Sequence, residues 1–471
     1  MDNLHFISID SETTVIFFPD TKRFIKVNKG GHHLVRAISN DIPYHDISND
    51  LNISVEDYEV YKEKIYSLAN CTRNGKNIFR NMHINEMNIK TLERLVIHVT
   101  NDCNLRCKYC YAHGGAYGGT RSMLSEDMAD IILDSFYSQF ERIVNVQLFG
   151  GEPLMNIKVM ERICEYVRFK DLQRNQKTNI ALVTNATLID DEFISIVKKY
   201  EIHITISYDG EVNVNNLLRP YEDGSCTSND ILNNTLRLYK ETNHSQPETI
   251  EVTYTQYHIE NNIKIVQIID NIKSMLENTS VHLVPVSSEE DCSYSIKDLQ
   301  PFAESIDEIF NNTDKVYSYS IADRIFYGLN KEYQPSRHIC VAGNSTLSVS
   351  VEGDVYPCFM FTNQDSLCLG NVKDSNLFKS EKFKSKLKKI GEFSDKTKNP
   401  ECKKCFIRSL CVGCLGLNAS HNQDHFEINH KICNMFRNMA EHAIKQYIKN
   451  EMSIEVNQDE KTTESKYATS I

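Results

Sequence analysis

The chain has 471 residues, with 64 Asp and Glu residues against 52 Lys and Arg residues and a formal net charge of -12. This length favours two or three domains, and the acidic balance argues against a phosphate-binding surface as the main function and against nucleic acid as a partner, while leaving room for a local basic patch. Because the chain opens without a basic, apolar leader and contains no apolar run long enough to cross a bilayer, we expect a cytoplasmic protein with no membrane partner.

Residues 1–90 are predicted to fold as a small α+β unit in which strands precede helices. Short β-branched and aromatic runs alternate with polar residues, and helix-like segments begin at His32 and Ser54. The three strand-like runs are HFISID, TTVIFF and RFIKV.

Residues 91–315 are predicted to form an α/β domain. Apolar strands alternate there with segments whose apolar residues recur at three- and four-residue spacing, as in SEDMADIILDSFYSQFE and EFISIVKKY. Six such β/α units favour a partial (β/α)6 barrel of the TIM type, with its ligand site at the carboxyl ends of the strands. The predicted strands are LVIHV, NVQLF, NIALV, IHITIS, IEVTYT and SVHLVPV.

Residues 316–450 contain eight cysteines, seven of them in one ordered series, among scattered Gly and Pro residues, and we expect this domain to fold around metal. Residues 451–471 are polar and charged, and we expect a disordered tail. Fifteen cysteines in a reduced cytoplasm favour metal ligation over disulfides. Five without a close partner in sequence are predicted to be small buried hydrophobic residues, namely Cys71, Cys164, Cys226, Cys292 and Cys368.

The first cysteine group, Cys103, Cys107 and Cys110, directly follows the first predicted strand of the α/β domain. Three thiolates suit zinc or an iron-sulfur cluster, and they leave one position of the metal or cluster free for another ligand. A structural zinc site with His113 as fourth ligand is one interpretation. The glycine-rich GGAYGG that follows is predicted to allow close backbone approach, with a flexible loop as the alternative.

This CxxxCxxC, with Tyr109 before its last cysteine, resembles the signature of the radical S-adenosylmethionine (SAM) enzymes. The resemblance implies that Cys103, Cys107 and Cys110 hold a [4Fe-4S] cluster whose unique iron binds SAM. One electron from the cluster would then cleave SAM to methionine and a 5′-deoxyadenosyl radical, which abstracts hydrogen from a substrate held in a dry, enclosed site.

Three later stretches resemble the SAM-binding segments of that family. LFGGEP is similar to the motif that meets the SAM amino group, LVTNATLI to the Thr-Asn-Gly-Thr stretch with Ala186 in place of glycine, and ISYDG with Arg219 to the segment that contacts the SAM ribose and carboxylate. Read alone, GGEP and Asp209-Gly210 are turns and Arg219 is a surface ion-pair partner. The resemblance implies SAM binding by Tyr109, Gly150, Gly151, Glu152, Pro153, Thr184, Asn185, Ser207, Asp209 and Arg219.

The order of the C-terminal cysteines resembles the SPASM domain of peptide-modifying radical SAM enzymes. It implies one auxiliary [4Fe-4S] cluster on Cys402, Cys405, Cys411 and Cys433, and a second on Cys340, Cys358 and Cys414, so that the protein holds three clusters. The second set is one ligand short, and either Cys368 or a substrate thiol would complete it. Taken alone, the block from Cys402 to Cys414 could be a four-cysteine zinc site.

The N-terminal unit resembles the winged-helix-like leader-binding domain of maturases that modify ribosomally made peptides, in which the leader adds a strand to a sheet edge. A structural extension that packs on the barrel is the alternative for this unit. With CKYCYAHGGAYGG, the later TYTQYH and the cysteine order, the chain is most similar to maturases that install thioether crosslinks. The implied partners are a precursor peptide with its leader and an electron donor such as a flavodoxin or ferredoxin. Carbon-carbon crosslinking, epimerisation and sulfatase formylglycine formation are alternatives, as is a zinc-binding interaction protein.

Overall fold

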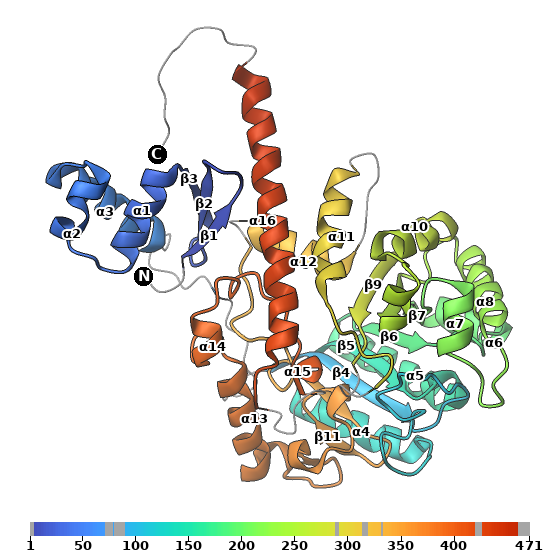
Figure 1. Cartoon of the computed structure of the whole chain (residues 1–471). Coiled ribbons are helices and arrows are strands. Elements are labelled where there is room, and N and C mark those ends of the chain that lie inside the picture. Colours follow the sequence, from blue (N-terminus) through green and yellow to red (C-terminus); the bar gives the residue numbers. More distant parts are fainter. Residues whose placement is uncertain are drawn as a thin grey trace.

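The computed structural model describes residues 4–70, 79, 90–287, 292–312, 319–330, 333–419 and 426–459. Its strands form two sheets, one of three strands near the N-terminus and one of nine strands in the body of the molecule (Figure 1). No helix within these residues combines the length and the apolar character that a membrane span requires.

The N-terminal unit has strands before helices, as the sequence predicts. The antiparallel strands are β1 (His5–Ser8), β2 (Thr14–Phe18) and β3 (Arg23–Val27), followed by α1 (Lys29–Ser39), α2 (Tyr44–Leu51) and α3 (Val55–Asn70). The sequence did not indicate α2. In α1, the Asn28 side chain caps the helix by accepting a hydrogen bond from the Gly31 N–H.

Strand β2 of this unit is buried on both faces. Ile16 and Phe18 pack into a cluster with residues of α1 and α3, whereas Val15 and Phe17 belong to the hydrophobic cluster of the main body. Because side chains alternate between the faces of a strand, one run of apolar residues joins the small sheet both to its own helices and to the rest of the molecule.

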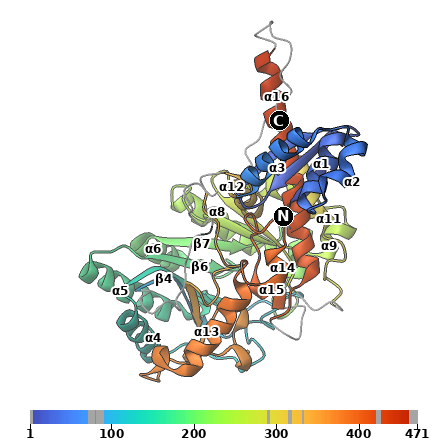
Figure 2. The same ribbon diagram turned by 90° about the vertical axis from the view of Figure 1, so that its left-hand side faces the viewer.

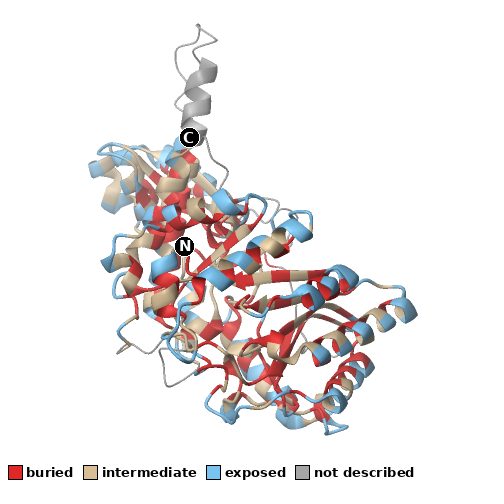
Figure 3. Ribbon diagram, turned by 90° about the vertical axis from the view of Figure 1, so that its right-hand side faces the viewer, coloured by how far each residue is buried: buried red, intermediate tan, exposed pale blue. Residues whose placement is uncertain are grey.

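The α/β domain has six parallel strands in chain order, each followed by helical structure, which confirms the predicted β/α alternation (Figures 1 and 2). The strands are β4 (Thr91–Thr100), β5 (Arg142–Gly150), β6 (Asn179–Thr184), β7 (Ile202–Ser207), β8 (Thr249–Tyr254) and β9 (Ser280–Pro285). The helices are α4 (Glu126–Gln139), α5 (Ile157–Arg174), α6 (Asp191–Tyr200), α7 (Val212–Leu218), α8 (Ser228–Glu241), α9 (Gln256–Glu260) and α10 (Ile265–Met275). Figure 3 shows the buried residues concentrated along these strands and the exposed residues on the outer helices.

The C-terminal cysteine region extends the same sheet, which the sequence did not indicate. Strand β10 (Thr346–Val349) pairs in parallel with β4, and β11 (Asp354–Tyr356) and β12 (Gly370–Asn371) continue it in antiparallel fashion. The region therefore shares the core of the α/β domain. Its helices and those leading to it are α11 (Gln300–Asn311), α12 (Ser320–Leu329), α13 (Glu381–Ser394), α14 (Pro400–Lys403), α15 (Leu415–Ala419) and α16 (His430–Asp459). Short 3-10 helices are η2 (Pro153–Asn156), η3 (Phe359–Phe361), η4 (Asp365–Leu367) and η5 (Leu377–Lys379).

Helix α16 runs to Asp459, so the expected disorder from residue 451 is wrong for residues 451–459, while residues 460–471 lie outside the described part of the chain. Polar composition alone did not reveal that these residues continue a helix whose earlier turns pack in the core.

The N-terminal unit rests against the cysteine-bearing C-terminal segment and α16 (Figures 1 and 2). The Arg408 Nε donates a hydrogen bond to Asp20 Oδ1 at 2.7 Å, and the Ser409 hydroxyl donates to the Pro19 carbonyl at 2.8 Å. The rings of His5 and Phe406 stack with centroids 3.5 Å apart. Both Arg408 and Ser409 lie between Cys405 and Cys411, so the two ends of the chain meet beside the C-terminal cysteines.

Candidate functional site

The first cysteine group lies at the carboxyl end of β4, where the sequence places it. Burial is the main reason why the pKa of Cys103 is raised to about 12. The Cys107 and Cys110 thiols lie close enough to contribute to this increase. Burial likewise raises the pKa of Cys107 to about 11. Because metal ligation requires thiolates, binding at this site is coupled to proton release.

Glycines bring the two motif loops together. A Cβ on Gly115, whose φ is +95°, would lie 2.7 Å from the Gly151 Cα, and a Cβ on Gly151 would overlap the Asp102 carbonyl oxygen at 2.1 Å. The Glu152 N–H donates to that carbonyl at 2.8 Å. The close approach expected of GGAYGG is therefore confirmed at Gly115, where it packs directly on GGEP. Gly150, with φ +141°, lies against the Thr100 backbone.

Glu152 links the ends of two neighbouring strands through its buried carboxylate. Its Oε1 accepts hydrogen bonds from the Thr184 hydroxyl at 2.7 Å and the Leu154 N–H at 3.0 Å, and its Oε2 accepts from the Asn185 N–H at 2.7 Å. Burial raises the pKa of Glu152, and these three donors oppose that effect. The predicted residues of LFGGEP and LVTNATLI are thus in direct contact, with Pro153 buried at the start of η2.

The Asn185 side chain continues this network to the cysteines. Its Nδ2 donates to Asn104 Oδ1 at 2.9 Å and lies 3.9 Å from the Cys103 sulfur. The next residue, Ala186, has φ +63°, in the left-handed region that favours glycine. Ala186 therefore adopts the left-handed backbone conformation that glycine would adopt easily at this position.

Tyr109, Asp209 and Arg219 form a buried chain of hydrogen bonds. The Tyr109 hydroxyl donates to the Asp209 carboxylate at 2.7 Å, and Arg219 Nη1 donates to the Tyr109 oxygen at 2.8 Å. The Arg219 Nε is buried and has no hydrogen-bond partner among the described residues, which leaves a charged donor available to a ligand. Arg219 also lowers the pKa of Cys107, opposing the effect of burial, so it lies next to the cysteine group.

Two residues near this chain complete its surroundings. Ser207 is half-buried at the carboxyl end of β7. His258, in the TYTQYH stretch, is buried, and its Nε2 lies 3.2 Å from the Asp209 carbonyl oxygen. The sequence identified this stretch only by resemblance, and a capping box between Thr255 and His258 explains the local fold.

The zinc interpretation of the first group is not supported. His113, the predicted fourth ligand, is exposed.

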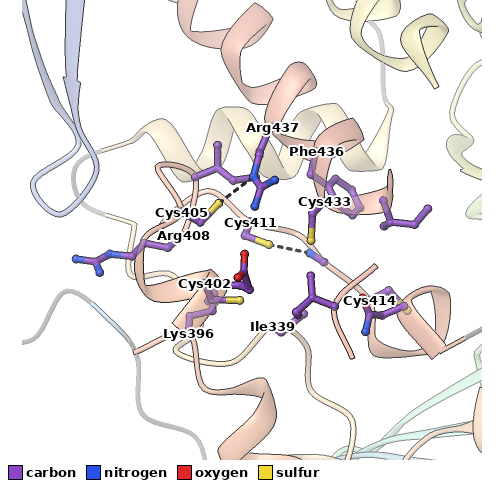
Figure 4. Close-up of a pocket in the computed structure, with 16 residues that line it drawn as sticks. Ile339, Lys396, Cys402, Cys405, Arg408, Cys411, Cys414, Cys433, Phe436 and Arg437 are labelled. Carbon is purple, nitrogen blue, oxygen red and sulfur yellow. Dashed lines mark hydrogen bonds between the residues drawn. The ribbon is translucent and has the colours of Figure 1, made fainter. Parts of the chain in front are cut away.

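Five of the C-terminal cysteines line a cavity (Figure 4). Cys402, Cys405, Cys411 and Cys433 line it from α14, the following loop and α16, and Cys414 also contributes to the lining. Burial, and after it the nearby Cys411 and Cys405 thiols, raise the pKa of Cys402 and of Cys433 to about 12. Four thiols thus converge on one space, as the resemblance implies.

Positive charge lies beside these thiols, which the sequence analysis missed. Arg437 Nε donates to the Cys405 sulfur at 3.4 Å, and the buried Lys396, only 1% exposed, also lines the cavity. Helical spacing could have indicated Arg437, because it lies one turn after Cys433 on α16. No pattern in the neighbouring sequence indicated that Lys396 lies at this cavity.

Cys340 and Cys358 lie outside that cavity and gather near Cys414. The Cys414 and Cys358 thiols both raise the pKa of Cys340, which burial brings to about 12. Cys368 does not join them. Its sulfur lies 3.8 Å from the Gly370 carbonyl oxygen, and its thiol is close enough to Tyr356 and Lys386 to favour a higher pKa in each. The neighbouring sulfur of Met360 is 4.0 Å from that of Cys414.

Tyr117 of the glycine-rich loop lies between this set and the first group. Burial raises its pKa, and the thiols of Cys110, Cys103 and Cys358 raise it further. Its hydroxyl donates to the Gly150 carbonyl at 3.3 Å, and its ring meets that of the buried His98 edge-on at 5.0 Å. Tyr117 is therefore within electrostatic reach of both the first group and Cys358 of the second set.

The cysteines predicted to be isolated behave differently from one another. Cys164 is fully buried, as predicted, but Cys226 is exposed, so that prediction is wrong. Cys226 is the last residue of a polar turn, DGSC, and has no apolar neighbour in this turn that would favour its burial. Cys292 and Cys368 are half-buried, and Cys71 lies outside the described residues.

Two family models match the chain. The radical SAM superfamily matches residues 97–272, and the SPASM iron-sulfur cluster-binding domain matches residues 340–406. This chain is a radical SAM enzyme with a SPASM domain. Such enzymes bind a [4Fe-4S] cluster and SAM, and the SPASM domain binds additional iron-sulfur clusters.

Several curated relatives match over long stretches. The uncharacterized protein MJ0907 of Methanocaldococcus jannaschii is 29% identical over 307 residues, 65% of this chain and 98% of that protein. The cysteine-type anaerobic sulfatase-maturating enzyme of Clostridium perfringens is 24% identical over 388 residues, 76% of this chain and 97% of that enzyme. The radical SAM cyclopropyl synthase TigE of Paramaledivibacter caminithermalis is 23% identical over 310 residues, 60% of each chain.

Solved structures share the fold. The structure of anSMEcpe with bound AdoMet and Cp18Cys peptide has a TM-score of 0.62 and 21% identity, over 77% of this chain and 99% of that one. Streptococcus suis SuiB bound to precursor peptide SuiA has a TM-score of 0.51 and 13% identity, over 92% of this chain and 100% of that one.

The residues of this radical SAM enzyme fit the groups that its family binds. Three thiols without a fourth protein ligand leave one iron of a cubane for SAM. The unpaired Arg219 Nε offers a charge-assisted hydrogen bond to an anionic group such as the SAM carboxylate. The four thiols around the C-terminal cavity supply a complete cluster ligand set.

Replacement of Arg437 by glutamine is expected to lower the reduction potential of a cluster held by Cys402, Cys405, Cys411 and Cys433. The guanidinium beside Cys405 stabilises the extra negative charge of the reduced state, and a charge-assisted bond of about 1.5 kcal/mol corresponds to about 60 mV for one electron. A redox titration followed by electron paramagnetic resonance measures this. Arg408→Gln is the control, because Arg408 lines the same cavity but is paired with Asp20. Equal potentials in the two variants would contradict the assignment.

Proposed function

We propose that this enzyme is a peptide maturase that installs thioether crosslinks in a ribosomally made precursor. Cys340, Cys358 and Cys414 carry the proposal, because they gather without a fourth thiol within the described part of the chain. A cluster on three cysteines has one iron open to a substrate thiol. In this proposal the protein holds three [4Fe-4S] clusters and acts in the cytoplasm.

The position of Cys368 supports the open iron. The sequence left Cys368 as a possible fourth ligand, but its thiol points to the Gly370 carbonyl and lies near Tyr356 and Lys386. Met360 is the remaining soft donor near Cys414. Met360→Leu separates the two possibilities: it leaves product formation intact if substrate completes the site, and changes the cluster spectrum before substrate addition if Met360 is a ligand.

The position of Tyr117 supports a shared reaction space. Tyr117 is within electrostatic reach of Cys103 and Cys110 on one side and of Cys358 on the other. A peptide held there would place a carbon atom next to SAM at the first cysteine group and a cysteine thiol next to the set of Cys340, Cys358 and Cys414. When bound, SAM and its cluster would supply the 5′-deoxyadenosyl radical that removes hydrogen from that carbon. Buried aromatic side chains exclude water from the space.

The N-terminal unit supports a peptide substrate. Its outer strand β3 is an edge of the three-stranded sheet, the kind of edge to which an extended leader adds a strand. The fold similarity to SuiB extends over 92% of this chain, against 77% for anSMEcpe. We assign leader binding to β3 on these grounds.

The test is anaerobic incubation of the enzyme with its precursor, SAM and a reductant, followed by mass spectrometry. For each thioether link, one carbon-bound hydrogen would leave in 5′-deoxyadenosine, the thiol proton would be released, and the surplus electron would pass to an auxiliary cluster. The product therefore loses two hydrogens and one free thiol per link. Alkylation with iodoacetamide counts the remaining thiols. Cys358→Ala is expected to abolish the link while SAM cleavage continues. An unchanged precursor mass in the presence of SAM cleavage would overturn the proposal.

The same experiment separates the main alternatives. Sulfatase maturation is supported by the 24% identity to the Clostridium perfringens enzyme, and it would yield formylglycine in a sulfatase peptide with no crosslink. A carbon-carbon crosslink would also remove two hydrogens but would leave every thiol free for alkylation. Epimerisation would leave the mass unchanged in water and add deuterium in heavy water.

A further inference from the structure

The segment from Lys379 to Arg408 reverses the charge of this acidic chain. It contains eleven Lys and Arg residues against four Asp and Glu residues, although the whole chain has a net charge of -12. Eight of its lysines are exposed, and we call them the lysine face: Lys379, Lys382, Lys384, Lys388, Lys389, Lys398, Lys403 and Lys404. The segment includes α13, α14 and the turn between them (Figures 1 and 2).

Helix α13 directs these charges outward. It buries Phe383, Leu387 and Ile390 on one side, and at 100° per residue its lysines fall on the opposite side. The hydrophobic contacts therefore fix the helix, while the lysines remain in solvent.

Most charges of the lysine face are not neutralised within the chain. Lys384 forms an ion pair with Glu381 at 3.6 Å, but Lys382, Lys388, Lys398, Lys403 and Lys404 have no carboxylate within 4.0 Å among the residues that the structure describes. Unpaired like charges repel one another, so the patch lowers its free energy when an acidic surface covers it.

The lysine face borders the C-terminal cavity. Lys403 and Lys404 are exposed and lie directly between Cys402 and Cys405, two of the cavity's thiols. Lys398 precedes α14 by two residues, and the buried Lys396 lines the cavity itself. A protein that contacts these lysines would lie next to the cluster that we assign to the cavity.

We propose that the lysine face is the docking surface for an acidic, low-potential electron carrier of the flavodoxin or ferredoxin class. This inference rests on the proposed function, in which Cys402, Cys405, Cys411 and Cys433 hold a cluster. In each encounter the reduced carrier loses one electron and this cluster gains one, with no bond formed or broken. Opposite charge brings the carrier to the lysine face and orients it there, which mainly raises the association rate.

Charge reversal at two lysines tests this proposal. The variant Lys388→Glu/Lys398→Glu changes exposed residues of the lysine face, whereas Lys158→Glu/Lys240→Glu changes exposed lysines on α5 and α8 and alters the net charge equally. The probe is a recombinant, strongly acidic bacterial flavodoxin. Its affinity is measured by calorimetry at low salt and at about 1 M salt, where the Debye length falls to about 3 Å, and cluster reduction by its hydroquinone is followed by stopped-flow absorbance.

The first variant is expected to bind flavodoxin at least about tenfold more weakly at low salt than the second, and to be reduced correspondingly more slowly. At high salt the two should converge. Iron content and product formation with dithionite, a small reductant that needs no docking surface, should be unchanged in both. Equal affinities at low salt, or equal losses in both variants, would overturn the docking surface. An iron content that shows no cluster in the cavity would instead refute the proposed function on which it rests.

Discussion

Replacement of Cys103, Cys107 and Cys110 by alanine is expected to remove about four irons per chain and to abolish SAM cleavage. The three thiols lie close enough to influence one another's pKa at the end of β4, and their set leaves one iron free for SAM. The other seven predicted ligands lie in the C-terminal region, away from these three, so about eight of about twelve irons should remain. Iron, acid-labile sulfide and 5′-deoxyadenosine are measured on anaerobically purified protein.

Cys226→Ala is the control for this experiment, because Cys226 is an exposed cysteine outside every set. It should keep both its iron and its activity. Loss of all iron in the triple variant, with intact folding by circular dichroism, would show that the three sites do not load independently. Zinc in place of iron in the unaltered protein would refute the radical chemistry altogether.

Replacement of Arg219 by methionine is expected to weaken SAM binding by about ten- to a hundredfold. Arg219 is 8% exposed, and its Nε has no partner in the described structure, so methionine fills similar space but removes a charge-assisted donor of about 1.5–3 kcal/mol. The dissociation constant for SAM is measured on cluster-loaded protein by equilibrium dialysis.

Two further variants show whether the geometry of the donor matters. Arg219→Lys keeps a positive charge but loses the planar fork, and should recover only part of the affinity. Arg237→Met, which removes a half-buried arginine of α8 that is paired with Asp191 and Glu241, should bind SAM normally. An Arg219→Met protein with full iron content and unchanged SAM affinity would exclude Arg219 from the SAM site.

The parts of this site that follow strand ends could be predicted from the sequence. Cys103, Glu152 and Asp209 each come soon after an apolar run, and parallel strands bring their carboxyl ends to one edge. The resemblance to the SPASM domain, rather than spacing alone, divided the C-terminal cysteines into two sets, and the structure groups Cys402, Cys405, Cys411 and Cys433 around a cavity and brings Cys358 and Cys414 close to Cys340. Short-range pattern and sheet geometry are sufficient for these features.

The parts that depend on contacts distant in sequence could not be predicted. The pairing of β10 with β4 joins residues about 250 positions apart, and no local pattern selects that edge. Arg437 and Lys396 approach the same cavity from different elements, and the unpaired Nε of Arg219 becomes visible only when all neighbours are in place. Burial and orientation are properties of the assembled core.

The contact between Pro19, Asp20 and the segment bearing Arg408 and Ser409 has a consequence for how leader recognition can be studied. Deleting residues 1–70 would remove the His5 ring that stacks on Phe406 and would expose to solvent the segment between Cys405 and Cys411. A truncated enzyme would therefore lose activity through a damaged cofactor site even if leader binding were irrelevant. Point substitutions along the free edge of β3, scored together with iron content, separate recognition of the peptide from integrity of the metal centre.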